Sequence, residues 1–131
     1  MADLAVTPTR LRPMEVIEAR LIPMIADQAI TKGQLVYRKA TGRAGLATAN
    51  EKPVGVATSS VGAGMAFDAL HYGMLAGYGL ADVAPAAVVY ASATAGAVSD
   101  TAAAPSVPVG TVHTLTDVTF TKVLFIDIPQ R

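Results

Sequence analysis

The amino-acid sequence predicts an all-β fold: a small β-barrel or sandwich of short antiparallel strands with an extended N-terminal arm. Three observations lead to this prediction. The chain has 131 residues, enough for one domain with a single core. Short runs rich in Val, Ile and Tyr alternate at close spacing with turns that contain Gly or Pro. The third observation is a degenerate internal repeat.

The repeat relates the first and second halves of the chain. The segment ITKGQLVYRKATG returns 53 positions later as VAPAAVVYASATA, so that Tyr37 corresponds to Tyr90. Each copy continues into a Pro-Val-Gly triplet, which begins at Pro53 in one and at Pro108 in the other. A duplicated unit of short apolar runs and turns specifies a scaffold more readily than a reaction centre. The predicted organisation is an arm, 1–13, and one β domain, 14–131, with the repeat at 30–57 and 83–112.

The arm is predicted to be extended because Pro8 and Pro13 break any helix and push their neighbours toward extended conformations. Leu4, Val6 and Leu11 are only weak apolar anchors, so we do not expect the arm to bury itself. It is then either disordered or laid on a partner, and its removal is expected to leave the core nearly as stable. The candidate partner-interface residues are Leu4, Val6, Arg10, Leu11, Arg12 and Met14.

Residues 14–25, MEVIEARLIPMI, are compatible with a short helix or with a strand. Val16 and Ala19 have the spacing of one helical face, as do Ile17 and Leu21. Pro23 and the β-branched residues favour a strand at the edge of a sheet, which is our interpretation.

The rest of the chain is divided into short strands by turn residues. Tyr72-Gly73 is interpreted as the turn between two strands. The equivalent residues Tyr37 and Tyr90 are expected to share a packing role. The strands are expected at 34–39, 44–48, 53–58, 65–70, 74–80, 87–91, 97–99, 107–113 and 118–128.

Composition points toward contact with other protein chains. Charged residues make up 15% of the chain, against about 25% in an average soluble protein. We therefore expect part of the surface to be covered, the alternative being a tight Ala-rich monomer. Basic residues are too few and scattered for a nucleic-acid interface, and no apolar run reaches the ~20 residues that span a bilayer. The N-terminal residues also lack the apolar region of a signal peptide.

The sequence predicts no catalytic, cofactor-binding or metal site and no enzyme activity. There is no cysteine, and the two histidines, His71 and His113, lack the ligand spacing of a zinc or calcium site. A catalytic histidine needs a nearby carboxylate or nucleophile. Asp68 and Asp117 lie three and four positions away, a separation that does not force contact in an extended chain.

The motif pattern resembles tailed-bacteriophage capsid cement proteins, also called head decoration proteins. The similarity covers roughly residues 30–112. The segments that carry it are ITKGQLVY, KPVGVATSSVGAGM, VAPAAVVY and VPVGTV. The second copy departs from the pattern, because Ala86 replaces Gly33 and Gly-Thr-Val replaces Gly-Val-Ala.

This resemblance implies a non-enzymatic function without a cofactor. Such proteins bind the outer surface of an expanded phage head, often as homotrimers, and lock neighbouring major capsid proteins together. The expected partners are the major capsid protein and copies of this chain, without nucleic acid or membrane. The expected location is the outer capsid surface of the virion, after synthesis in the host cytoplasm.

Two alternatives remain open at this stage. One is another structural virion component, such as a tail, fibre or baseplate subunit. The other is a carbohydrate-binding β module, which would require a pocket that holds His71 or His113 beside an aspartate.

Overall fold

The computed structural model describes residues 3–6, 8, 12–14, 19–80, 83–103, 106–114 and 122–129. Within these residues the protein is all-β, with ten strands and no helix, and every strand pair is antiparallel. The predicted fold class is therefore confirmed. The strands are β1 (Arg12–Met14), β2 (Arg20–Ile25), β3 (Leu35–Arg38), β4 (Ala44–Leu46), β5 (Pro53–Ala57), β6 (Ala66–Ala76), β7 (Val88–Ala91), β8 (Val98–Ser99), β9 (Pro108–Thr114) and β10 (Lys122–Asp127).

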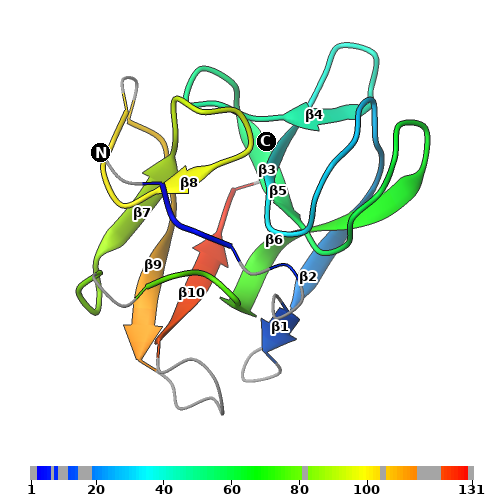
Figure 1. Cartoon of the computed structure of the whole chain (residues 1–131). Helices are drawn as coiled ribbons and strands as arrows, with labels where there is room; N and C mark the ends of the chain where they lie inside the picture. The colour runs from blue at the N-terminus through cyan, green and yellow to red at the C-terminus, as the bar shows by residue number, and fades with distance from the viewer. Residues whose placement is uncertain are drawn as a thin grey trace.

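The strands form one curled sheet in the order β4-β3-β5-β6-β10-β9-β7-β8 (Figure 1). The long strand β6 lies at its centre. Strand β5 pairs with β6 at Ala69 and Leu70, and β10 pairs with it from Tyr72 to Leu75. Strands β2 and β1 also pair with β6. Because Tyr72 pairs with both β2 and β10, β2 must lie on the other edge of β6, opposite β5 and β10.

The sequence repeat is a structural repeat. Strands β3, β4 and β5 form the first unit, and β7, β8 and β9 form the second. Tyr37 pairs with Pro53, and Tyr90 pairs with Pro108. The ladder shifts register just before each of these tyrosines, so even the irregularity is duplicated.

The Pro-Val-Gly triplet has a steric explanation in both units. A Cβ atom on Gly55 would collide with the carbonyl group of Leu70, and one on Gly110 would collide with the carbonyl group of Phe125. The neighbouring strand approaches too closely for any side chain at these two positions. Glycine is therefore required at the same place in each unit.

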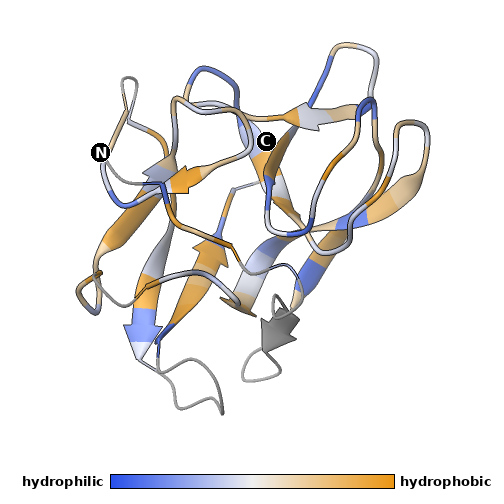
Figure 2. Ribbon diagram, in the orientation of Figure 1, coloured by the Kyte–Doolittle hydropathy of each residue, from blue (hydrophilic) through white to orange (hydrophobic). Residues whose placement is uncertain are grey.

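Two hydrophobic clusters form the core. The larger cluster joins the two units and includes Leu35 and Val56 of the first and Val89 and Val109 of the second. The smaller cluster packs Met24 of β2 and Phe67 of β6 against residues of the first unit. Hydrophobic residues line β8 and β10 in Figure 2, in keeping with their place in the larger cluster.

The predicted turn at Tyr72-Gly73 is wrong, because β6 runs without interruption through both residues. Gly73 has a φ of 145°, a conformation that suits glycine and lets the strand twist without turning back. Pairing with β10 and β2 at Tyr72 holds the backbone extended there. The strand interpretation of 14–25 is confirmed for β2, whereas residues 15–18 lie outside the described part of the chain.

Candidate functional site

The N-terminal segment, residues 3–6, packs on the chain's own body (Figure 1). The backbone N–H of Leu4 donates to Val98 O of β8 at 2.7 Å, and the N–H of Gly79 donates to Ala5 O at 2.7 Å. Leu4 is only 8% exposed and belongs to the larger core cluster. The expectation that the arm cannot bury itself is therefore wrong for this segment, because the seam between β8 and residues 78–79 offers both hydrogen bonds and apolar contact.

The same kind of closure occurs in the first unit. Asp27 N donates to Ala44 O, the structural counterpart of Val98 O. The Asp27 carboxylate accepts a hydrogen bond at 2.8 Å from Lys39, whose repeat counterpart, Ser92, donates to Asp3 Oδ1 at 2.6 Å. Residues 3–6 and the segment around Asp27 thus contact equivalent places of the two units, but the bridge of Asp3 to β8 is antiparallel whereas that of Ala26 to β4 is parallel. We call residues 3–6 the N-terminal strap.

The remaining candidate interface residues have mixed outcomes. Val6 is half-buried and forms an isolated bridge with Tyr78. Arg12 and Met14 lie in β1, which pairs with β6, but their side chains lie outside what the structure describes. Arg10 and Leu11 also lie outside the described residues.

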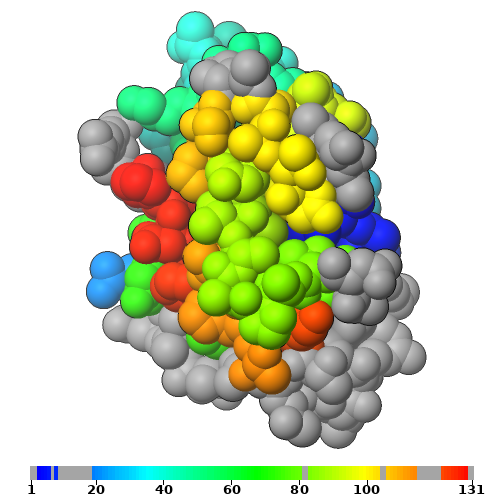
Figure 3. Space-filling view, turned by 90° about the vertical axis from the view of Figure 1, so that its left-hand side faces the viewer, coloured from blue at the N-terminus to red at the C-terminus, as the bar shows by residue number. Residues whose placement is uncertain are grey.

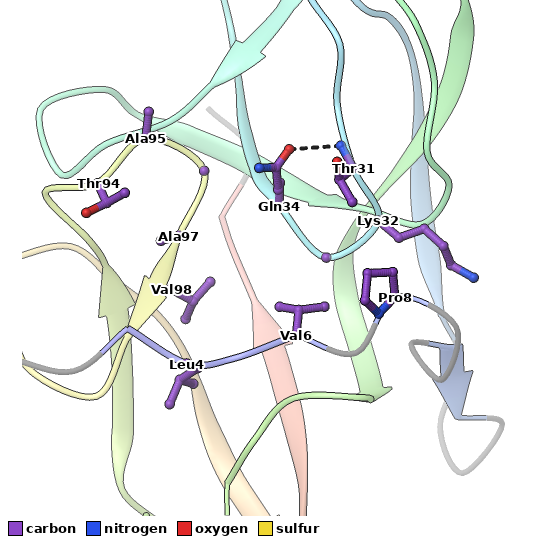
Figure 4. A pocket seen from close by; sticks show the side chains of 12 residues that line it. Leu4, Val6, Pro8, Thr31, Lys32, Gln34, Thr94, Ala95, Ala97 and Val98 are labelled. Atoms are coloured by element: carbon purple, nitrogen blue, oxygen red, sulfur yellow. Dashed lines mark hydrogen bonds between the residues drawn. The ribbon is translucent and has the colours of Figure 1, made fainter.

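A hollow of about 330 Å³ lies beside the N-terminal strap (Figure 4). Its walls are the strap with Pro8, the turn at 31–34 and the hairpin at 94–98. Gln34 Oε1 accepts a hydrogen bond from Thr31 N at 2.8 Å, which ties that amide to its own turn. In Figure 4 the side chain of Lys32 extends away from Gln34 and Val98. The described lining is mainly small or apolar, and among those residues no carboxylate or histidine occurs.

A second hollow, of about 280 Å³, lies between the two units near the end of β10. Prolines from three places converge on it: Pro53 begins β5, Pro108 begins β9 and Pro129 follows β10. Figure 3 shows atoms of the C-terminal segment, in red, beside atoms of the segment that contains β9, in orange. The described residues that line it are Lys52, Pro53, Ser106, Val107, Pro108, Ile128 and Pro129, and we call this cavity the proline hollow.

Strand β2 exposes apolar side chains on its outer face. Leu21 is 46% and Ile25 40% exposed, and the neighbouring Met65 is 57% exposed. Ile22 and Met24, on the opposite face, pack on the smaller core cluster. Pro23 lacks an N–H, which makes this edge a poor template for strand addition. We call Leu21, Pro23, Ile25 and Met65 the β2 face, and it is suited to side-chain contact with another protein surface.

The histidines have structural contacts. A hydrogen bond of 2.9 Å joins His113 Nε2 and Thr111 Oγ1, and the His113 ring packs edge-on against Phe125. The carbonyl oxygen of His71 accepts a hydrogen bond from Ile128 N. In the part of the chain that the structure describes, no group of three or more His, Asp or Glu side chains could hold a metal ion. The described residues include no helix, and therefore none that is long and apolar enough to cross a membrane.

No family model, curated protein or solved structure matches this chain.

Proposed function

We propose that this chain is a capsid decoration protein, which binds the outer surface of an expanded phage head and stabilises contacts between major capsid proteins. The observation that carries the proposal is the β2 face, whose large apolar side chains are exposed on a chain with only 15% charged residues. Such a face favours association with protein. The motif resemblance over roughly residues 30–112 is the reason for proposing a phage head as the partner.

The duplicated fold supports a binding role over a catalytic one. The two units agree in the residues that build strands and differ at exposed positions, as in Thr31 and Ala84. One backbone thus presents two different surfaces to its surroundings. Proteins that bind a lattice at many equivalent positions stabilise it even when each contact is weak, because every copy bridges several subunits. Binding only to the expanded lattice would favour that state by mass action.

The test is co-sedimentation with expanded heads that lack the protein, over a range of salt concentrations. The proposal expects the wild-type chain to pellet with the heads until the sites are saturated. Unexpanded heads are the matched control and are expected to bind less. If the chain stays in the supernatant with expanded heads at every salt concentration, the proposal fails.

Within this proposal we assign the β2 face to contact between copies, because the resemblance implies a homotrimer and the β2 face is an exposed apolar surface. Replacing Leu21 and Ile25 together with glutamine should reduce the mass measured by light scattering, with the thermal midpoint largely unchanged. Thr101→Gln with Asp100→Asn, on a loop away from β2, is the control. An unchanged mass in the Leu21/Ile25 variant would remove the β2 face from this assignment.

A further inference from the structure

We infer that the proline hollow is a preformed socket for an aromatic side chain with a nearby carboxylate, presented by the shell protein. This inference rests on the proposed function, since it names the chemistry of that partner. It concerns a different surface from the β2 face, which lies on the other edge of β6.

The hollow exists because β6 changes its partner. At Leu70 β6 pairs with β5, and from Tyr72 onward β10 takes the same edge. Strands β5 and β10 therefore diverge, and the gap between them is lined by the start of β5 and the residues after β10. The start of β9, which is equivalent to the start of β5, forms the third wall.

The walls of the hollow are rigid before any ligand binds. Each proline has a fixed φ and almost no side-chain freedom. Ile128 N donates to His71 O at 2.8 Å, and Ala91 N donates to Val107 O at 2.9 Å, so both other apolar residues lie on hydrogen-bonded backbone. Pro53 and Ile128 are buried, whereas Pro108 and Pro129 are exposed. A ligand would therefore meet a fixed apolar floor with little ordering cost.

The size and lining of the proline hollow favour an aromatic ring as its ligand. A cavity of about 150 Å³ lined by apolar side chains is enough to bind benzene. The proline hollow, at about 280 Å³, has room for one aromatic side chain and its backbone attachment. The proline rings offer apolar contact surface to an aromatic ring, and buried aromatic side chains provide the largest contact area per residue.

The positive charge at the rim of the hollow favours a ligand that has a carboxylate beside its aromatic ring. Lys52 lines the hollow and is exposed. No other Lys or Arg occurs in the sequence from residue 53 to residue 121. Among the described residues that line the hollow, Lys52 is the only cationic side chain, and a carboxylate beside the ring would pair with it. A charge at the edge of an interface acts mainly on the rate of association and on its salt dependence.

The first experiment uses small probes in place of the shell. Backbone amide shifts of the full chain are followed by NMR during titration with 3-phenylpropionate, which has both a ring and a carboxylate. The shifts are expected at Lys52, Val107 and Ile128, with weaker binding of 3-phenylpropanol, which lacks the charge. If 3-phenylpropionate leaves these residues unshifted at millimolar concentrations, the assigned ligand chemistry is wrong.

The second experiment measures co-sedimentation of variants with expanded heads. Val107→Trp fills the hollow and Lys52→Glu reverses its charge, and each is expected to weaken binding about tenfold or more, by roughly the loss of one anchoring contact. Thr101→Trp and Lys32→Glu, away from the hollow, are the controls for bulk and charge. Because Val107 also touches the core, its thermal midpoint is checked, and Lys52→Glu, at an exposed position, provides the independent reading.

The outcomes separate the two proposals. If the wild-type chain binds heads and both hollow variants bind equally well, the socket is refuted while the decoration function remains. If the wild-type chain does not bind heads, the proposed function is refuted, and the socket inference, which rests on it, is refuted with it. Loss of binding in both hollow variants, with the two controls unaffected, supports the socket.

Discussion

Gly33 and Ala86 adopt the same left-handed backbone conformation at equivalent positions of the two units, with φ values of 88° and 68°. Gly33 N donates to Ala57 O, and Ala86 N donates to Val112 O, so the hydrogen bonds are equivalent as well. Among the described residues other than glycine, Ala86 alone has a positive φ. The second unit has thus kept the backbone of the first after losing the residue best suited to it.

Because the two residues share this backbone conformation, Ala86→Gly and Gly33→Ala are predicted to have opposite effects on stability. Ala86→Gly relieves a conformation that costs an L-residue about 1–2 kcal/mol, and part of the gain is lost to the greater freedom of glycine when unfolded. We expect a net stabilisation of about 0.5–1 kcal/mol. Gly33→Ala should destabilise by about 1–2 kcal/mol. Urea unfolding measures both, and a destabilised Ala86→Gly variant would contradict the equivalence.

The N-terminal strap is predicted to contribute to stability because Leu4 is part of the larger core cluster. Leu4→Ala should lower the free energy of unfolding by about 2–3 kcal/mol, at the low end for a buried leucine because the strap is at the surface. Removal of residues 2–6 should lower it further. Thermal unfolding is the measurement, and the control is Ala5→Ser at the neighbouring exposed position. A thermal midpoint unaffected by the deletion would show that the seam closes without the strap.

The strands could be predicted from sequence wherever local pattern determines them. The Val-Tyr runs and the Pro-Val-Gly triplets predicted the ends of β3, β5, β7 and β9 to within about one residue. Prediction failed in β6, since Tyr72-Gly73 has the composition of a turn. There the extended backbone is maintained by pairing with β10, whose residues are more than 50 positions away. Local propensity cannot report such a contact.

The candidate sites could be predicted only in part. Leu4 and Val6 of the strap have no apolar partner nearby in the sequence, because the seam that receives the strap is formed by β8 and residues 78–79, far along the chain. Pro53 and Pro108 were visible in the repeat as strand starts. Their convergence with Pro129 depends on the divergence of β5 and β10, which no periodicity in the sequence encodes.

Tyr78 is predicted to make stability fall at high pH. Its hydroxyl group is buried and donates to Gly33 O at 2.9 Å. Burial raises the pKa of Tyr78 well above its usual range. The folded state therefore keeps a proton that the unfolded state releases above about pH 10, so this contribution to stability is present below pH 10 and is lost as pH rises toward the folded pKa.

Tyr78→Phe removes both the proton and the hydrogen bond. At neutral pH it should destabilise by about 1–2 kcal/mol, because Gly33 O loses a buried donor. Above pH 10 the difference from wild type should shrink, as measured by urea unfolding at several pH values. Tyr72→Phe, on the half-exposed face of β6, is the control. A difference that stays constant up to pH 12 would contradict this account.

The Asp27–Lys39 pair is predicted to make the stability of the fold depend on pH in the acid range. The hydrogen bond from Lys39, followed by its charge, lowers the pKa of the Asp27 carboxyl. Since the folded pKa is below the unfolded value of about 3.9, the pair stabilises the fold above that pH and loses its effect as pH falls through the folded pKa. NMR titration of the Asp27 carboxyl should give a pKa below 3.9, and Lys39→Met should raise it. An equal pKa in both proteins would show that the pair does not persist in solution.

The two equivalent tyrosines are predicted to differ in their contribution to stability, although the repeat alone suggests equal roles. Both are half-buried. Tyr37 packs against the larger core cluster and covers Gly45 on β4, where a Cβ would lie 3.2 Å from the tyrosine ring. The corresponding partner of Tyr90 is Ser99, which has a side chain of its own. Loss of the Tyr37 ring therefore exposes more backbone and core than loss of the Tyr90 ring.

Tyr37→Ala should cost about 2–3 kcal/mol and Tyr90→Ala about 1–2 kcal/mol, both below the value for a fully buried ring. Urea unfolding of the two variants side by side measures the difference, and equal losses would mean that the cross-strand glycine contributes nothing to the role of Tyr37.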